Sequence, residues 1–340
     1  MAKIITFGEI MLRLAPNGYY RFFQNDQMQA TFGGGEANVA VSLANFGMDV
    51  AYVTKLPDHA IGRAAENSLR YFGVDVRHIV HGGDRVGVYY LEKGASQRGS
   101  VCIYDRKHSS IQEAAPEDFD WDAIFEGAEW FHFTGITPAL GPNLVEICEQ
   151  ACVSAKKHGV KISCDLNYRG KLWSRAEARE AMTRLCKYVD VCISNEEDAK
   201  DVFGIEAENT DIYGGKLNHD GYRSVARQLR ERFGFEKVAI TLRSSLSASD
   251  NLWAGMLSDG EQDCFSKEYS LHIVDRVGGG DSFGAGLIYA LMQGWDAQRC
   301  IDFAVAASAL KHSVEGDFNR VSVAEVQKLA GGDGSGRVQR

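Results

Sequence analysis

The sequence predicts an α/β protein with a mostly parallel central sheet and helices on both faces of that sheet. Two observations support this prediction: short apolar runs alternate with amphipathic stretches, and glycine follows the end of most amphipathic stretches. The apolar runs that we expect to form strands are residues 4–7, 50–55, 130–134, 160–166, 189–194 and 237–242. The stretches that we expect to form helices are residues 37–46, 60–72, 144–158, 175–187 and 225–233.

The ends of the expected helices agree with this pattern. Gly47, Gly73, Gly159 and Gly234 each follow an amphipathic stretch, and glycine just past a helix end is the usual stop signal. Strands are expected shortly after Gly47, Gly159 and Gly234, which gives the alternation of helix and strand that is typical of a parallel sheet.

Two segments interrupt the alternation. Residues 12–32 carry Tyr19, Tyr20, Phe22 and Phe23 among polar residues, and residues 84–108 contain two apolar runs without a helix between them. Both are typical of antiparallel strands, so we expect one small β-sheet that stands off the main domain and acts as a lid. The alternative is an ordinary extension of the main sheet at its edge. We expect residues 1–330 to form a single domain and the glycine-rich residues 331–340 to form a flexible tail.

Composition and charge exclude several classes of protein. The chain has 340 residues, 45% of them hydrophobic, which excludes a disordered chain. Its formal net charge of −9 disfavours general binding to nucleic acid or to an anionic membrane. The N-terminal apolar run ends at Phe7, too short for a signal peptide, and no apolar run is long enough to span a membrane, so a cytoplasmic location is expected.

The eight cysteines include no C-x-x-C pair. Cys164 and Cys192 lie in apolar runs that are typical of strands, so we interpret the cysteines as small buried hydrophobic residues of a reducing compartment. Zinc binding or disulfide formation is the alternative interpretation.

A glycine triplet near the C-terminus carries the strongest chemical prediction. Gly278, Gly279 and Gly280 separate an apolar run at residues 271–274 from an expected helix at residues 281–292. Backbone N–H groups and the positive end of a helix dipole form an anion site at such a position. Asp281 then serves either as a base that faces a bound phosphate or as the N-cap of the helix. The spacing fits neither a P-loop nor a dinucleotide-binding motif.

A second glycine triplet opens the expected helix at residues 37–46. It reads Gly33-Gly-Gly-Glu-Ala-Asn38, which allows close approach of a ligand, and Asn38 offers both a donor and an acceptor to sugar hydroxyls. A tight turn with a helix cap is the alternative interpretation.

Together the two motifs resemble the paired signatures of the ribokinase-like (PfkB) carbohydrate kinases, over about residues 3–325. The resemblance implies a three-layer α/β fold with a small β-sheet lid, and ATP-dependent phosphorylation of a sugar hydroxyl. By the same resemblance Asp281 is the general base, and Gly278, Gly279 and Gly280 form the anion hole.

Other segments look most like the 2-keto-3-deoxygluconate kinases of that family, which form a 6-phosphorylated sugar acid. The matching segments are residues 133–140, Asp165-Leu-Asn-Tyr-Arg169 and Tyr104-Asp-Arg106. The resemblance implies that substrate contacts come from Gly34, Tyr89, Tyr104, Arg106, Arg169 and Asp317. Guanidinium groups suit a carboxylate because the fork can donate two hydrogen bonds. A neutral-sugar kinase such as a fructokinase, or a non-catalytic nucleotide or sugar sensor, is the alternative function.

The expected ATP site departs from the family pattern at three places. Asn195 and Asp198 resemble the family's N-x-x-E element, which organises Mg²⁺ and phosphate water, but Asp198 replaces the usual Glu. Thr241 and Arg243 lie where ATP is held, in a segment, residues 241–247, that lacks the usual glycines. Arg276 stands where the family carries a smaller residue. ATP contacts are thus expected from Asn195, Thr241, Arg243, Gly278 and Gly280.

The resemblance also implies partners and ions. Mg²⁺ is expected to arrive with ATP, and a monovalent cation such as K⁺ is expected near Asp275. The expected ligands are ATP and a small sugar acid, and a homo-oligomer is expected, through the lids of two copies or of higher order.

Overall fold

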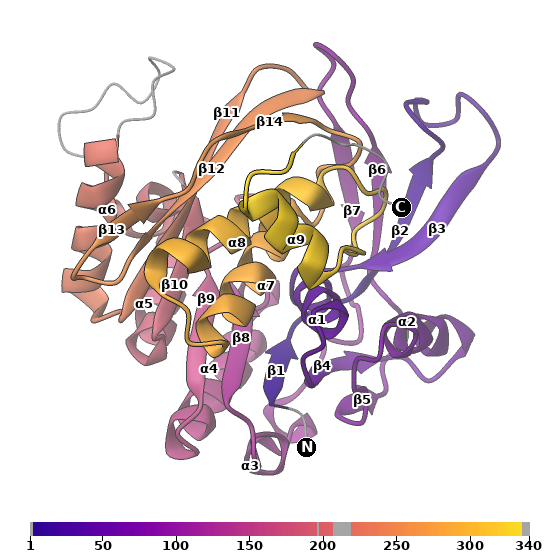
Figure 1. Ribbon diagram of the computed structural model, residues 1–340. Coiled ribbons are helices and arrows are strands. Elements are labelled where there is room, and N and C mark those ends of the chain that lie inside the picture. The colour runs from indigo at the N-terminus through magenta and orange to yellow at the C-terminus, as the bar shows by residue number, and fades with distance from the viewer. Residues whose placement is uncertain (1–2, 196, 207–218, 335–340) are drawn as a thin grey trace.

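A ten-stranded sheet forms the centre of the structure, a computed structural model that describes residues 3–195, 197–206 and 219–334 (Figure 1). The strand order is β13 (Asp263–Phe265), β12 (Asp250–Ser258), β11 (Lys237–Ser245), β10 (Val191–Asn195), β9 (Lys161–Asp165), β8 (Trp130–Thr134), β1 (Ile4–Phe7), β4 (Val50–Leu56) and β5 (Ile79–His81), while β14 (Tyr269–His272) pairs with β12. Pairing is parallel from β11 to β5 and antiparallel around β12. The prediction of a mostly parallel sheet is therefore confirmed.

Helices cover both faces of this sheet (Figure 1). They are α1 (Gly35–Asn45), α2 (Ala60–Arg70), α3 (Trp121–Ile124), α4 (Pro142–Lys157), α5 (Arg175–Leu185), α6 (His219–Phe233), α7 (Gly279–Met292), α8 (Ala297–Lys311) and α9 (Val323–Ala330). Short helical turns lie at Pro116–Asp118, Pro138–Leu140, Cys186–Tyr188 and Ala199–Phe203. Side chains alternate along each strand: Phe131 packs into the hydrophobic cluster that contains residues of α4 and α5, and Trp130 into the cluster with α1, α7 and α8. This alternation produces the three layers.

The two interrupting segments form one separate four-stranded sheet, in the order β3 (Met28–Gly33), β2 (Met11–Pro16), β6 (Val88–Glu92) and β7 (Val101–Asp105). The small sheet stands beside the main one (Figure 1), so the expected insertion is confirmed, and the alternative, an extension of the main sheet, is wrong. The expectation of purely antiparallel pairing is also wrong, because β2 pairs with β6 in parallel. In the chain, β2 follows β1 and β6 follows β5. Because β1 and β5 run in the same direction in the main sheet, the chain leaves that sheet in the same direction before β2 and before β6.

All eight cysteines are free, and seven of them are buried. Burial raises the pKa of the Cys148, Cys164 and Cys192 thiols well above its usual range, as expected of small hydrophobic side chains. Among the described residues, no group of three or more His, Cys, Asp or Glu side chains could hold a metal ion directly. The disulfide alternative is wrong, because all eight cysteines are free.

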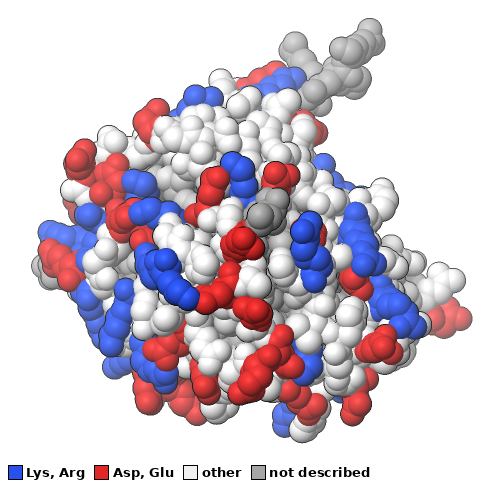
Figure 2. Space-filling view, turned by 90° about the horizontal axis from the view of Figure 1, so that it is seen from below, with Lys and Arg blue, Asp and Glu red and all other residues white. Residues whose placement is uncertain are grey.

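Two further observations concern the surface and the termini. On the face shown in Figure 2, acidic and basic side chains of the described residues are interspersed. No helix within the described ranges is both long enough and apolar enough to cross a membrane. Of the tail expected at residues 331–340, residues 335–340 lie outside the described part of the chain.

Candidate active site

The glycine triplet at residues 278–280 shapes the N-terminus of α7. Gly278 is the N-cap, with a left-handed φ of 81°, and the helix begins at Gly279 rather than at Asp281. The preceding strand, β14, likewise ends at His272, short of the expected run at residues 271–274. Asp281 is thus the third residue of the helix and its side chain caps nothing, so the N-cap interpretation is wrong.

This N-terminus is suited to an anion. The N–H groups of Gly280 and Asp281 donate to no acceptor among the described residues, as expected in the first turn of a helix. Gly280 is exposed, and a Cβ built on it would meet open space. Free donors, the positive end of the helix dipole and room above them together suit a phosphate group.

Asp281 is held by the other glycine motif. The Asn38 amide, on α1, donates a hydrogen bond of 2.6 Å to Asp281 Oδ2, while its Oδ1 accepts from the Gly34 N–H at 3.3 Å. Burial raises the pKa of Asp281 to about 6, the bond from Asn38 opposes that rise, and the charge of Asp317 adds to it. The carboxylate is therefore mostly ionised at neutral pH and poised to accept a proton.

Asp317 explains why two of the glycines are required. A Cβ at Gly33 would overlap the Asp317 carboxylate, and a Cβ at Gly278 would overlap the Asp317 carbonyl oxygen. Both motifs therefore pack against the same residue, and a third glycine, Gly34, is packed against the backbone of Glu9. The glycines permit this close approach of three loops.

Tyr89 and Tyr104, on adjacent strands of the small sheet, face the same region. The Tyr89 hydroxyl donates to Asp317 Oδ2 at 2.5 Å, which ties β6 to the loop after α8. The Tyr104 ring lies 6.0 Å from that of Tyr89 and is 41% exposed. Tyr104 therefore retains a free surface for a ligand, whereas the Tyr89 hydroxyl is already engaged.

The two arginines expected to bind a carboxylate differ in their surroundings. Arg169 is exposed, forms no ion pair among the described residues and donates one bond of 3.1 Å to the Tyr168 carbonyl. Its charge lowers the pKa of both Asp281 and Tyr104, against the larger effect of burial, so the guanidinium lies within electrostatic range of both groups.

Arg106 is instead 8% exposed and is already paired. Its Nε donates to Glu9 Oε2 at 2.7 Å, and its Nη2 donates to the same oxygen. Ser109 Oγ donates to the other Glu9 oxygen at 2.7 Å. Glu9 therefore neutralises Arg106 inside the protein, and of the two guanidinium groups only that of Arg169 is unpaired.

Residues 241–245 of the expected ATP segment, residues 241–247, are strand rather than loop in this structure. Strand β11 continues to Ser245 and forms a hairpin with β12, and the described backbone has no positive φ between residues 241 and 249. Thr241 is buried, and Arg243 is exposed. The lack of glycine therefore causes no strain here.

Basic side chains surround the N-terminus of α7 on this side. Burial and the neighbouring charge of Arg243 lower the pKa of Arg276. Lys311 is fully buried, and a Cβ at Gly278 would lie 3.3 Å from its Cε. Three cations near free backbone donors favour a polyphosphate.

Asn195 and Asp198 lie where β10 ends. Asn195 Oδ1 accepts from the N–H groups of Glu197 and Asp198, both at 2.8 Å, and Asp198 Oδ1 accepts from the Tyr168 N–H at 3.1 Å. Burial and the charges of Asp198 and Asp281 raise the pKa of Asp165 well above its usual range. Asp165 therefore lies within electrostatic range of two other carboxylates, and a divalent cation nearby would reduce their mutual repulsion.

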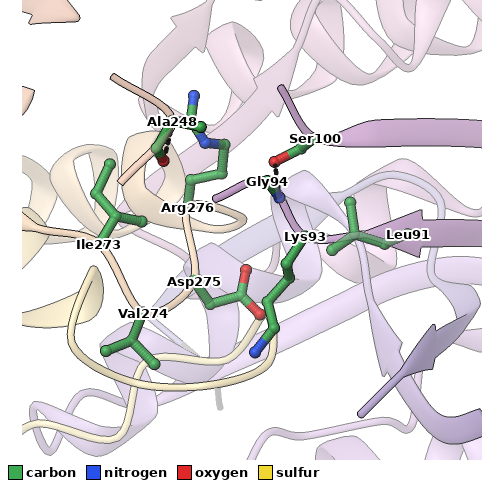
Figure 3. A pocket seen from close by; sticks show the side chains of 9 residues that line it. All are labelled: Leu91, Lys93, Gly94, Ser100, Ala248, Ile273, Val274, Asp275 and Arg276. Carbon is green, nitrogen blue, oxygen red and sulfur yellow. Dashed lines mark hydrogen bonds between the residues drawn. The ribbon is translucent and has the colours of Figure 1, made fainter. Parts of the chain in front are cut away.

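Asp275 lines a pocket between the small sheet and the segment before α7 (Figure 3). The lining consists of Leu91, Lys93, Gly94, Ser100, Ala248, Ile273, Val274, Asp275 and Arg276. Asp275 Oδ1 accepts from the Val277 N–H at 3.1 Å, and Oδ2 accepts from Arg13 Nη2 at 2.6 Å and from the Gly316 N–H at 3.2 Å. The expected cation ligand is thus already occupied.

Arg13, Lys311 and Glu36 were missed by the sequence reasoning. Arg13 lies on the buried side of β2, Lys311 ends α8, and Glu36 on α1 accepts from Thr134 and Thr137. A charge inside an alternating strand was the available indication for Arg13, and none marked Lys311 beyond its place at the end of an alanine-rich stretch.

A helix N-terminus with free donors, an ionised carboxylate beside it and a lid-like sheet define the site of a phosphotransferase that acts on small hydroxyl compounds. The chain matches the model of the pfkB family carbohydrate kinases over residues 1–322, and it belongs to that family. The ribokinase-like fold and the carbohydrate kinase class predicted from the sequence are thereby confirmed.

Two similar proteins are named as kinases of 2-dehydro-3-deoxy sugar acids, and a third similar structure contains ATP and Mg²⁺. The crystal structure of 2-dehydro-3-deoxygluconokinase from Thermotoga maritima is 50% identical, covers 97% of this chain and 98% of that one, and has a TM-score of 0.94. The 2-dehydro-3-deoxygalactonokinase of Haloferax volcanii is 32% identical, over 98% of both chains. A structure named for ribokinase II of E. coli, in complex with ATP and Mg²⁺, shares the fold at 19% identity, with a TM-score of 0.81 and coverage of 97% and 99%.

Proposed function

We propose that the protein transfers the γ-phosphoryl group of ATP to 2-keto-3-deoxygluconate, giving the 6-phospho sugar acid. The observation that carries this proposal is the position of Asp281, an ionised carboxylate beside the free N–H groups of α7. The names of the 50% and 32% identical relatives support the same substrate class, that of the 2-dehydro-3-deoxy sugar acids.

In the proposed mechanism, Asp281 Oδ accepts the proton of the attacking hydroxyl. The N–H groups of Gly280 and Asp281 then stabilise the charge on the transferred phosphoryl group. Gly278, as the N-cap, and Gly279, as the first residue of α7, shape the turn that presents these N–H groups. Arg169 binds the substrate carboxylate on the side of the site that faces Tyr104, whose pKa its charge lowers, and Arg106 fixes Glu9 beside the glycine motif. Asn38 orients Asp281.

Mg²⁺ fits the carboxylates at the ends of β9 and β10. Mg²⁺ keeps several waters and uses one or two carboxylates together with phosphate oxygens, so a closed cage of protein ligands is not required. We propose that Asp198, through water, and Asp165 face the ion, with Asn195 keeping Asp198 in place. The ion would neutralise phosphate charge. Thr241 and Arg243 are proposed to contact ATP from β11.

We further propose a single domain over residues 1–330, a small sheet that closes as a lid, and a homodimer that forms through the small sheets. Phe23 is 83% exposed and Ile103 51% exposed, and a second copy would cover these side chains. The eight free cysteines support a reducing, cytoplasmic location.

A coupled assay of ADP release tests the proposed function. The substrates are 2-keto-3-deoxygluconate, 2-keto-3-deoxygalactonate and fructose, each with Mg·ATP. We expect the two acids to be phosphorylated with a much higher kcat/KM than fructose. Preference for fructose would overturn the assignment of an acid substrate. If ATP is consumed with none of the three compounds, the proposed substrate class is wrong. Mass and NMR analysis of the product identifies the phosphorylated hydroxyl.

A further inference from the structure

Arg13 forms the centre of a buried ion network that joins the small sheet to the loops beside α7. Its Nη2 donates to Asp275 Oδ2 at 2.6 Å and its Nη1 donates to Asp317 Oδ1 at 2.7 Å. The three side chains are 5%, 1% and 2% exposed. A guanidinium that bridges two carboxylates in a dry environment fixes both in position.

The two carboxylates belong to the loops on either side of the anion site. Asp275 begins the turn that leads to Gly278, and Asp317 packs against both Gly33 and Gly278. Tyr89 donates to the second Asp317 oxygen at 2.5 Å. Arg13 therefore links the two glycine motifs through Asp317 and the α7 turn through Asp275.

The network leaves no need for a further cation at Asp275. Three N–H donors, from Arg13, Val277 and Gly316, already use most of the acceptor positions of this carboxylate. Arg13 supplies its opposite charge. Arg276 lines the pocket that Asp275 faces (Figure 3) and would repel an added cation, while Lys93, which also lines it, is already paired with Glu315 at 2.6 Å.

Lys311 brings a second positive charge to the same place. It is fully buried and donates to the Val314 carbonyl at 3.1 Å. Burial lowers the pKa of Lys311, and the charges of Asp275 and Asp317 oppose that fall. Arg13 and Lys311 thus balance Asp275 and Asp317 within the protein. K⁺ does not fit beside Asp275 in this arrangement.

We propose that Arg13 is the built-in cation of this site: a positioning residue that holds the Asp275 and Asp317 loops around the anion hole, so that the kinase needs no monovalent metal ion. This inference rests on the proposed function only for its kinetic readout. The expected monovalent cation at Asp275 is accordingly replaced by a guanidinium from the small sheet.

The first test uses the unmodified protein. kcat is measured with 2-keto-3-deoxygluconate and Mg·ATP in potassium, sodium and tetramethylammonium chloride at equal ionic strength, and the melting temperature is measured in the same salts without substrates. We expect the same kcat and the same melting temperature in all three. A saturable rise of either quantity with K⁺ would overturn the proposal. If the acid is not turned over in any salt, the proposed function fails, while the melting experiment still tests the ion site.

The second test uses Arg13→Gln and Arg13→Lys, with Arg85→Gln as the matched control. Arg85 forms an exposed ion pair with Asp105 of the small sheet, outside the site. We expect Arg13→Gln to lower kcat by roughly 10²-fold, because a small misplacement of catalytic groups has that effect, with little change in the KM of either substrate. Arg13→Lys should recover part of the loss, and the control should match the unmodified protein. A folded Arg13→Lys or Arg13→Gln protein with unchanged kcat would contradict the positioning role.

Discussion

The Asn38 amide and the Asp281 carboxylate join the two glycine motifs through a hydrogen bond of 2.6 Å between Nδ2 and Oδ2. Their positions in the sequence are 243 residues apart, and each lies in the first turns of its helix, α1 or α7. The bond favours the ionised form of Asp281, whereas burial favours the protonated form, and the balance leaves a pKa of about 6. Asn38 therefore both orients the proposed base and tunes its protonation.

Replacement of the base tests its chemical role. Asp281→Asn keeps the size of the side chain but cannot accept a proton, so we expect kcat to fall by roughly 10²–10⁴-fold, the usual contribution of general base catalysis. Steady-state kinetics measure the loss, and circular dichroism checks the fold. The matched control is Asp296→Asn, which changes the N-cap of α8 in the same way and should leave kcat unaltered. Near-normal turnover by the Asp281 variant would eliminate this residue as the base.

The pH profile tests the tuning by Asn38. Asp281 must be ionised to accept a proton, and its pKa is raised to about 6, so kcat/KM should fall as the pH drops through about 6. Asn38→Ala removes the bond that lowers this pKa, so the acid limb should move to higher pH. The two profiles are measured over the same range with the same buffers. An acid limb at the same pH in both proteins would show that Asn38 does not set the protonation of the base.

Arg169 should distinguish an acid from a neutral sugar. Arg169→Ala is expected to weaken binding of the keto-deoxy acid by about 1.5–3 kcal/mol, the contribution of hydrogen bonds to a charged group. A neutral sugar that the enzyme accepts should be much less affected, because it lacks the carboxylate. Titration calorimetry with both ligands measures the difference. Equal losses would assign Arg169 a structural role.

Arg106→Ala serves as the comparison for that experiment. Arg106 is paired with Glu9 inside the protein, so its removal leaves a buried carboxylate without its cation. The expected result is a loss of about 3–5 kcal/mol in the free energy of unfolding, the range for a broken buried ion pair. Urea denaturation of this variant and of Arg169→Ala should therefore separate the two arginines: the first destabilises the fold, and the second changes ligand binding.

Glu36 predicts a pH dependence of stability. The carboxyl is 1% exposed, and burial raises its pKa to about 7, although Thr134 and Thr137 donate to Oε1. Because the folded-state pKa is higher than the unfolded one, ionisation costs more in the folded protein, and stability should decrease as the pH rises from about 4.5 to about 7.

Glu36→Gln isolates this effect, because the amide oxygen can still accept from both threonines. The variant should be more stable than the unmodified protein above pH 7 by up to about 3 kcal/mol, the linkage value of a shift of this size, and the advantage should vanish at low pH. Urea midpoints at several pH values measure the difference between the two proteins. A difference that does not vary with pH would contradict the raised pKa.

The parts of the site that could be predicted from sequence are those carried by local motifs. Gly278, Asp281 and Asn38 stand in short patterns whose backbone geometry follows from glycine itself, and the structure places them together. Arg13 could not be found in this way, because its partners Asp275 and Asp317 are 262 and 304 residues away. Only the fold brings them into contact.

The fold, like the site, could be predicted from the sequence only where it depends on local patterns. Hydrophobic alternation and glycine stop signals indicated the strands and helices of the parallel sheet, since each depends on neighbouring residues. The parallel pairing of β2 with β6 was not predictable from local pattern, because it depends on the direction in which the chain leaves β1 and β5. The pairing of Arg106 with Glu9 was likewise hidden by 97 residues of separation.

Movement of the small sheet is the last prediction. The inner strands are anchored to the main domain, β2 through Arg13 and β6 through Tyr89, whereas the outer strands β3 and β7 are largely exposed. We therefore expect the outer strands to respond most to substrate. Hydrogen exchange in residues 12–32 and 84–108 should slow when the sugar acid binds, with little change in α4.

The physical reason for closure is electrostatic and chemical together. The net charge of −9 repels an anionic acid and ATP, but salt screens that repulsion over about 8 Å, so we expect local groups such as Arg169 to decide binding. Closing Tyr104 over Arg169 would exclude water, and an open site would let ATP phosphorylate water instead of sugar. A neutral sugar that is not phosphorylated serves as the ligand control for the exchange experiment. Equal exchange with and without the acid would show that the small sheet is rigid and does not close as a lid, while the kinase assignment would stand.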